Sequence, residues 1–295
     1  MPTFAFVKLV GPFDLRLSLR AAASFYPGFE AAPRLLRLAI PIDGEPAVVE
    51  IRQTKPSIVK ASSTIPVYPK RLYDLAAWLA SADLDLRPFY RIARGHPTMS
   101  AVVKRLKGLK PFRPASLFEM GIIAITEQQL SLAAAFHIRT RLIERFGEPV
   151  DDLRMFPPPE SIAAASLDEL RACGLSRQKA DYIRGFAQRV SEGGLTFDEL
   201  KHKTDAEVRK RLMSCKGFGD WSIQYVLTRG FGRADCLPLE DIGLRRVIGM
   251  HLSLGRYLSP EQLSEALSPF APFRALAAFY VSVYARLQGT SAESG

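Results

Sequence analysis

The pattern of apolar and polar residues changes character about sixty-five residues into the chain. Residues 13–20 alternate between apolar and polar side chains, and this period of two predicts a half-buried strand. Two apolar runs, 36–40 and 47–51, flank an Asp43-Gly44 pair that is typical of a tight hairpin turn. We therefore expect strands over the first 65 residues or so.

From Lys70 onward the apolar residues recur at helical spacing. Leu72, Leu75 and Leu79 follow the 3.6-residue period, and the segment 118–134 follows it less strictly. Helix starts are predicted at Ser166, Ser176 and Ser259, and the first and third have Glu or Gln three residues later, as in a capping box. A last, aromatic-rich helix is expected over 273–287. The fold class is therefore α+β: a small antiparallel β-containing N-terminal domain, then an all-α body.

The chain is basic. It has 295 residues, with 40 Lys and Arg against 30 Asp and Glu, a net charge of +10 and an isoelectric point near 9.6. Surface charge of this kind can serve solubility alone. It also favours a polyanionic partner, because cationic side chains release counterions from phosphates. No basic amphipathic helix stands out, so nucleic acid is favoured over a membrane surface.

The three cysteines and four histidines give no metal-binding pattern. No two cysteines form a Cys-x-x-Cys pair, and no histidines lie at ligand spacing, so we expect no metal site. Sparse cysteines fit a reducing compartment. The N-terminal residues lack the apolar core of a signal peptide, and no run approaches the length of a spanning helix. These features predict an intracellular, cytoplasmic protein without a membrane partner.

The segment 216–219, Lys-Gly-Phe-Gly, is the first candidate binding element. Glycines tolerate positive φ and let the backbone approach a ligand closely. A helix that begins directly afterwards would aim its N–H groups and dipole at the same point, which suits a phosphate oxygen. Lys216 adds positive charge. The alternative is a plain turn between two helices, because Gly-x-Gly alone is weak evidence.

Two segments together resemble a known signature. KGFGDWSIQY (216–225) and LPLEDIGLRR (237–246) are similar to the helix-hairpin-helix and catalytic aspartate of the HhH-GPD DNA glycosylases, most of all to the DNA-3-methyladenine glycosylase II branch. Residues 118–131, 146–149 and 174–180 resemble further segments of the family in order. The resemblance covers about 85–287. It implies an N-terminal domain over 1–85, then a mostly α-helical glycosylase body of two subdomains over 86–295.

The resemblance also implies roles for individual residues. Asp241 stands where the family has its catalytic aspartate, and its neighbour Glu240 competes for the role. A helix N-terminal position, as a cap or a favourable charge, is the plainer explanation of either acid. The implied DNA-binding residues are Lys216, Gly217, Phe218, Gly219, Ser222 and Gln129. The implied base-pocket residues are Trp221, Tyr225, Gln128 and Tyr280.

Trp221 occupies the position of the nucleophilic lysine in relatives that also cut the DNA backbone. An indole cannot form a Schiff base, so the resemblance implies a monofunctional enzyme that uses water. Trp221 and Tyr225 share a helix face and could form either a wall for an extruded base or part of the core. Gln129 takes the place of a wedge residue that is bulky and apolar in some relatives. Glu127 and Ser282 also depart from the family pattern.

The function implied is base-excision repair. A monofunctional glycosylase would flip an alkylated base of the 3-methyladenine type out of duplex DNA and hydrolyse its glycosidic bond with Asp241. The alternative is a noncatalytic helix-hairpin-helix protein that binds DNA damage. The expected partner is double-stranded DNA containing damaged bases, with the protein a nucleoid-associated monomer. No cofactor is expected beyond a monovalent cation that the hairpin carbonyls could hold by family analogy.

Overall fold

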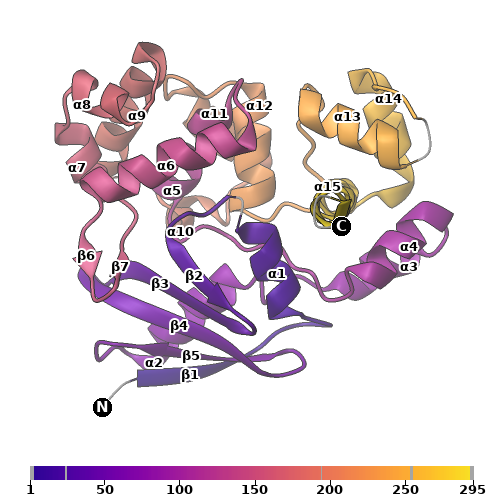
Figure 1. Ribbon diagram of the computed structural model, residues 1–295, viewed down its shortest axis with the longest axis horizontal. Helices are drawn as coiled ribbons and strands as arrows, with labels where there is room; N and C mark the ends of the chain where they lie inside the picture. Colours follow the sequence, from indigo (N-terminus) through magenta and orange to yellow (C-terminus); the bar gives the residue numbers. More distant parts are fainter. Residues whose placement is uncertain (1–2, 24, 194, 253–254, 293–295) are drawn as a thin grey trace.

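The computed structural model describes residues 3–23, 25–193, 195–252 and 255–292. Its N-terminal part is a five-stranded antiparallel sheet with strand order β1-β5-β4-β3-β2. The strands are β1 (Thr3–Lys8), β2 (Phe29–Ala32), β3 (Leu35–Ile42), β4 (Glu45–Lys55) and β5 (Ile58–Ser63). Helices α1 (Leu15–Ala22) and α2 (Pro69–Leu79) share a hydrophobic core with this sheet, which lies at the lower left of Figure 1. The expected N-terminal antiparallel sheet is confirmed.

The hairpin between β3 and β4 turns at Asp43 and Gly44. Both have positive φ, 53° and 88°, as the tight turn predicted from this pair requires. Ala39 pairs with Val48 in the adjoining ladder, so the apolar runs on either side lie in register.

The strand predicted over 13–20 is wrong, because this segment forms α1. Asp14 caps the helix by accepting a hydrogen bond from the Leu17 amide at 3.0 Å. Leu15 and Leu19 are buried, four residues apart on one helix face, while the intervening Leu17 is only partly buried. Leucines at every second position fit both periods. The Asp14 cap and the burial of leucines on successive turns of one face favour the helix.

The rest of the chain is mostly helical and forms two subdomains, each with its own hydrophobic core (Figure 1). The first contains α5 (Leu117–Glu127), α6 (Leu132–Phe146), α7 (Pro159–Ala164), α8 (Leu167–Ala172), α9 (Arg177–Ser191), α10 (Phe197–Leu200), α11 (Asp205–Met213), α12 (Asp220–Tyr225) and a π-helical turn, η1 (Val226–Gly230). The second joins α3 (Leu86–Ala93) and α4 (Pro97–Arg105) to α13 (Ile242–His251), α14 (Pro260–Leu267), the short 3₁₀ turn η2 (Ser268–Phe270) and α15 (Arg274–Ala292).

The helix starts at Ser166, Ser176 and Ser259 are confirmed. Each serine accepts a hydrogen bond from the amide three residues later, and Ser166 and Ser259 complete capping boxes with Glu169 and Gln262. The last helix begins at Arg274, as predicted to within one residue. A division between domains after residue 85 remains a proposal, since Phe112 still belongs to the core of the sheet.

Helix α5 is the centre of the first subdomain. Every residue of it except Glu119 is buried, because other helices surround it on all sides. The helical pattern predicted over 118–134 is interrupted: α5 ends at Glu127, and Gln129 has a φ of 54° before α6 begins at Leu132. Leu130, which fits the apolar period, lies in this loop and is 41% exposed. The α5–α6 loop, residues 128–131, therefore projects from a rigid helix.

A short ribbon of β6 (Pro149–Val150) and β7 (Leu153–Arg154) ties the helical body to the sheet. Leu153 and Met155 share a small apolar cluster with Ala39 and Val48. Beside it, Arg37 makes a bidentate ion pair with Asp152, with N–O distances of 2.7 and 2.8 Å. In the part of the chain described, no single helix is both long and apolar enough to cross a membrane, and one bent pair, Pro260–Phe270 with Arg274–Gln288, passes that test of length and composition.

Candidate active site

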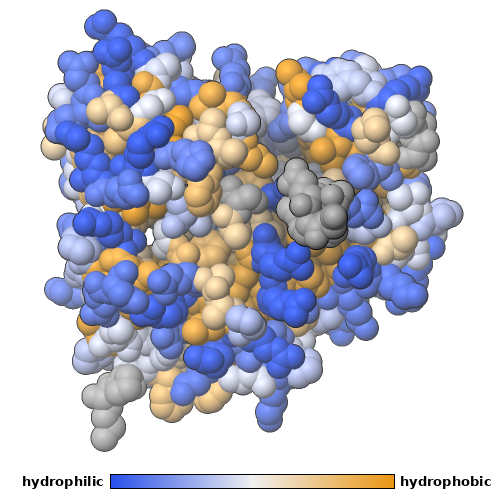
Figure 2. Space-filling model, in the orientation of Figure 1, coloured by the Kyte–Doolittle hydropathy of each residue, from blue (hydrophilic) through white to orange (hydrophobic). Residues whose placement is uncertain are grey.

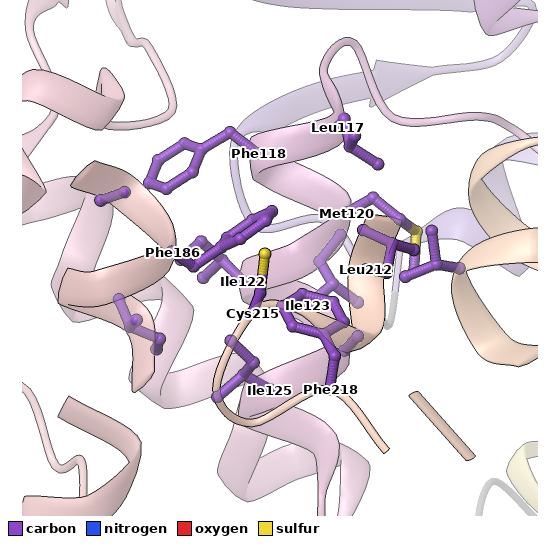
Figure 3. Close-up of a cluster of buried hydrophobic side chains, with 14 of the residues drawn as sticks. Leu117, Phe118, Met120, Ile122, Ile123, Ile125, Phe186, Leu212, Cys215 and Phe218 are labelled. Carbon is purple, nitrogen blue, oxygen red and sulfur yellow. The ribbon is translucent and has the colours of Figure 1, made fainter. Parts of the chain in front are cut away.

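The Lys216–Gly219 hairpin connects α11 to α12, and Phe218 anchors it to the core of the first subdomain. This ring is buried, and its centroid lies 4.9 Å from that of Phe186 in the core around Cys215 (Figure 3). Gly217 has a φ of 89°, and a Cβ at this position would lie 2.6 Å from Cδ2 of Tyr182. Both the backbone conformation and the neighbouring ring therefore require glycine here. Phe218, predicted to contact DNA, has a side chain that holds the hairpin in place.

The outer edge of the hairpin is open. Gly219 is exposed, and a Cβ built on it would have nothing within 4 Å. It is the N-cap residue of α12, and no side chain caps that helix. Lys216 is also exposed. The hairpin thus presents a bare backbone, the start of a helix and a positive charge on one surface.

The α5–α6 loop is fastened to this hairpin by Gln128. Its amide nitrogen donates to the carbonyl of Gly217 at 2.7 Å and to the hydroxyl of Ser222 at 2.8 Å. Lys179, at the start of α9, donates to the carbonyl oxygen of Thr126 at 3.0 Å and also to that of Gln128. Gln128 therefore joins the α5–α6 loop to the hairpin and, through the buried Ser222, to α12, while Gln129 is exposed at the tip of the loop.

Asp241 is the N-cap of α13, and both of its carboxylate oxygens are held. Oδ1 accepts from the amide of Leu244 at 2.8 Å, and Oδ2 accepts from the indole nitrogen of Trp221 at 2.9 Å. The carboxylate remains partly exposed. Asp241 therefore does cap α13, as the simplest explanation of this acid predicts. It also contacts Trp221 on α12, the helix after the hairpin. Glu240 instead points to solvent, 3.9 Å from Arg245.

Trp221 and Tyr225 stack on one another, one helical turn apart. Their ring centroids lie 5.1 Å apart, with an angle of 12° between the planes. Both are partly buried, as expected of a wall that keeps one face accessible. The hydroxyl of Tyr225 donates to Oε2 of Glu127 at 2.7 Å. Asp241, Trp221, Tyr225 and Glu127 thus form one continuous row of contacts.

Behind this row lies a buried ion pair. Glu127 is 3.2 Å from the fully buried guanidinium of Arg139, which also donates to the hydroxyl of Thr126 at 2.9 Å. Burial raises the pKa of Glu127, and the charge of Arg139 opposes that shift. Burial also raises the pKa of Tyr225 well above its ordinary value. The phenol therefore stays protonated and can serve as the donor to Glu127.

Tyr280, predicted as a base-pocket residue, is a core residue in this structure. It is fully buried, shares a hydrogen bond of 2.9 Å with the hydroxyl of Tyr90 and donates to the carbonyl of Leu109 at 2.7 Å. The core-packing alternative therefore describes it. In the sequence alone, an aromatic residue on a helix carries no mark that distinguishes a pocket role from a core role.

Three residues of the site were not predicted to act there: Glu127, Arg139 and Lys179. Glu127 ends an otherwise apolar helix, and a charged residue in that setting signals a buried partner. Its partner lies twelve residues further along the chain, so only the packing of α6 against α5 identifies it. Among the described residues, no group of three or more His, Cys, Asp or Glu side chains could hold a metal ion.

Comparison with known proteins identifies the family. The model of the HhH-GPD superfamily of base excision DNA repair proteins matches residues 122–272, about half of the chain. This range includes the α5–α6 loop, the hairpin and Asp241. The chain belongs to this superfamily.

Individual relatives of this chain are named as DNA-3-methyladenine glycosylases. The chain is 30% identical to the Bacillus subtilis protein YfjP over 184 residues, which are 62% of this chain and 64% of YfjP. It is 28% identical over 203 residues to a Bacillus subtilis DNA-3-methyladenine glycosylase, covering 68% of this chain and 67% of that protein. The chain therefore spans about two thirds of the length of these curated relatives.

Solved structures share the fold. A 3-methyladenine DNA glycosylase from Archaeoglobus fulgidus superimposes with a TM-score of 0.83 at 24% identity, over 95% of this chain and 98% of that one. The Schizosaccharomyces pombe 3-methyladenine DNA glycosylase Mag1, solved with abasic DNA, superimposes with a TM-score of 0.58 at 26% identity, over 65% of this chain and 93% of that one. The first match extends across the N-terminal sheet as well as the helical body.

Proposed function

We propose that this chain is a monofunctional DNA glycosylase that removes alkylated bases from duplex DNA. The observation that carries the proposal is the hydrogen bond between Trp221 and Asp241. This hydrogen bond places a carboxylate beside the stacked rings of Trp221 and Tyr225. Both rings belong to α12, the helix that begins directly after a hairpin suited to binding a phosphate. Binding DNA requires only the hairpin. Cleavage of a glycosidic bond requires, in addition, a fixed acid next to an aromatic wall.

The proposed role of Asp241 is electrostatic. As the base leaves, the sugar acquires oxocarbenium character, as in glycoside hydrolysis. A carboxylate at about 4 Å stabilises that charge by roughly 4 kcal/mol at an effective dielectric near 20. This corresponds to about a thousandfold in rate. A carboxylate has about four acceptor sites, so the hydrogen bonds to Trp221 and Leu244 leave capacity to orient or deprotonate the attacking water.

The proposed DNA contacts come from two loops that the structure joins. The hairpin offers Lys216 and the backbone at Gly217 and Gly219 to phosphates, and Gln129 at the tip of the α5–α6 loop would fill the space of a flipped nucleotide. Gln128 holds the two loops at a fixed separation. A surface of this kind would carry the steep salt dependence of phosphate binding.

The proposed substrate is an N-alkylated purine of the 3-methyladenine type. Curated relatives carry that activity in their names, including the DNA-3-methyladenine glycosylase 2 of Escherichia coli, which is 29% identical over 169 residues. A cationic base is already a good leaving group and needs no general acid. Stacked Trp221 and Tyr225 offer such a base an electron-rich face.

The test is release of free base from methylated duplex DNA by the purified protein. We expect the parent to release base and Asp241→Asn to retain DNA binding while its rate falls about a thousandfold. Glu240→Gln, the neighbouring exposed acid, is the matched control and should match the parent. If the parent binds damaged DNA yet releases nothing, the noncatalytic damage-binding alternative replaces this proposal.

Monofunctional action is tested separately, by borohydride trapping. Trp221 stands where lyase-competent relatives carry a lysine, so we expect an intact abasic strand and no covalent adduct. An adduct that Lys216→Gln abolishes would show that the exposed lysine before the hairpin acts as the nucleophile, and monofunctional cleavage would be rejected.

A further inference from the structure

A large groove lies away from the hairpin, between the N-terminal domain and the second helical subdomain. Its volume is about 1090 Å³. Its walls come from α1, the β2–β3 turn, the end of α4 and the last turns of α15. The residues that line it are Asp14, Arg16, Leu17, Arg20, Arg34, Arg105, Leu106, Tyr284, Leu287 and Gln288. Figure 2 shows hydrophilic side chains gathered over α1 and beside the C-terminal end of α15.

Four arginines line this groove. Arg16, Arg20, Arg34 and Arg105 are all exposed, and within the described residues none makes an ion pair or a side-chain hydrogen bond. Most of the other arginines on this protein are paired, as Arg37 is with Asp152. The one acid in the lining, Asp14, is already engaged as the N-cap of α1. Like charges held together in this way repel one another unless a negative ligand joins them.

The size and chemistry of the groove select the kind of ligand. Small-molecule sites are mostly apolar and usually hold about 300–1000 Å³. This groove, at about 1090 Å³, is slightly larger than that range, and four guanidinium groups line it. Guanidinium groups pair with phosphates in a bidentate manner, and a polynucleotide supplies phosphates at regular intervals along an extended chain.

The groove and the candidate active site lie on opposite sides of α15. Arg286 stands over the Phe25 ring at 4.8 Å, and Arg229 of η1, the turn that directly follows α12, stands over the same ring at 4.3 Å. Tyr284, two residues earlier, lines the groove. Two residues correspond to a rotation of about 200° around an α-helix, so the two side chains leave it in opposite directions.

We propose that this groove binds the phosphodiester backbone of a second DNA segment, separate from the duplex held at the hairpin. The N-terminal domain would then be part of the DNA-binding machinery, since it supplies Arg16, Arg20 and Arg34. Tyr284 is partly buried in the groove wall and offers a flat face for a base. A positive groove with an aromatic platform is the arrangement that holds single strands.

The experiment measures binding of a short fluorescent oligonucleotide, single-stranded or duplex, to the full chain over a range of salt concentrations. The test variant is R16Q/R20Q/R105Q, which leaves out Arg34 because its φ is 64°. The control is R52Q/R94Q/R256Q, three exposed arginines without a side-chain partner among the described residues. Each variant lowers the net charge from +10 by three, so a general charge effect moves both alike.

We expect the test variant to bind the single strand at least tenfold more weakly, with a log–log salt slope smaller by about 2, and the control to match the parent. Tyr284→Ala should weaken single-strand binding and leave duplex binding unchanged if a base stacks there. Loss of duplex binding alone would identify a duplex as the second segment. Protein saturated with lesion duplex should still bind the strand.

Two results would overturn this inference: equal losses in the test and control variants, or equal competition by polyglutamate of matched charge. Neither depends on base release. A protein that excises no base but shows this pattern would reject the proposed function and keep the groove. A protein that releases base normally, and whose arginine variant binds DNA like the parent, would keep the proposed function and reject the groove as a DNA-binding site.

Discussion

Trp221 donates a hydrogen bond to Asp241 across the boundary between the two helical subdomains. Trp221 lies on α12, which packs into the first core, and Asp241 begins α13, which packs into the second. The contact fixes the position of the carboxylate relative to the hairpin that precedes Trp221. Most of the proposed chemistry therefore depends on how the two subdomains are docked.

Trp221→Phe should slow base release without weakening DNA binding. Phenylalanine keeps a ring to stack on Tyr225 and removes the N–H that holds Oδ2 of Asp241. A hydrogen bond to a charged group is worth about 1.5–3 kcal/mol, so we expect kcat to fall tenfold or more. Single-turnover kinetics on a methylated duplex give the rate, and fluorescence anisotropy gives Kd. A change in Kd alone would assign Trp221 to binding.

Gly217→Ala and Gly219→Ala should separate stability from DNA binding. At Gly217 the φ of 89° and the Tyr182 ring oppose a Cβ, so we expect a loss of about 1–3 kcal/mol in the free energy of unfolding. At Gly219 the φ is −98° and nothing lies within 4 Å, so stability should change little. The Gly219 variant should instead lose DNA affinity, because its methyl group covers the exposed edge of the hairpin.

Chemical denaturation and DNA titration of both variants check this pair of outcomes. Full DNA affinity in a folded Gly219→Ala variant would mean that DNA does not approach this edge.

Glu127→Gln should be strongly destabilising, although the amide can still accept the hydrogen bond from Tyr225. Removing the carboxylate leaves the guanidinium of Arg139 buried and unpaired, which costs about 3–5 kcal/mol. In the double variant with Arg139→Met, both charges are gone, so we expect stability to return toward that of the parent. Urea denaturation of the single and double variants forms the cycle. Additive losses would show that the two charges are not coupled.

Glu119 should make stability depend on pH. Its side chain is partly buried, and this desolvation raises the pKa of the carboxyl group in the folded protein to about 7, from an unfolded value of 4.5. The folded state therefore binds the proton more tightly, so this contribution is fully present below about pH 4.5 and is lost as the pH rises through about 7. Glu119→Gln cannot titrate, so relative to the parent it should gain stability between these values. Parallel stability curves from pH 4 to 8 would contradict this.

Much of the local structure could be predicted because it depends on neighbouring residues. The Asp43-Gly44 turn, the capping boxes at Ser166 and Ser259 and the helix after the hairpin each follow from a few residues of sequence. The segment 13–20 could not be assigned correctly, because leucines at every second position fit a strand as well as a helix. The Asp14 cap and the burial of Leu15 and Leu19 in the core of the sheet favour the helix.

The sequence by itself predicted the hairpin and the helix that follows it, and its resemblance to the family singled out Asp241, since these features depend on consecutive residues. Tertiary structure alone decided that Trp221 donates to Asp241, that Glu127 pairs with Arg139 and that Tyr280 lies in the core. The physical reason is that burial and hydrogen-bond partners are properties of docked helices. Residues far apart in the chain supply them, and no local spacing records which of those residues will meet.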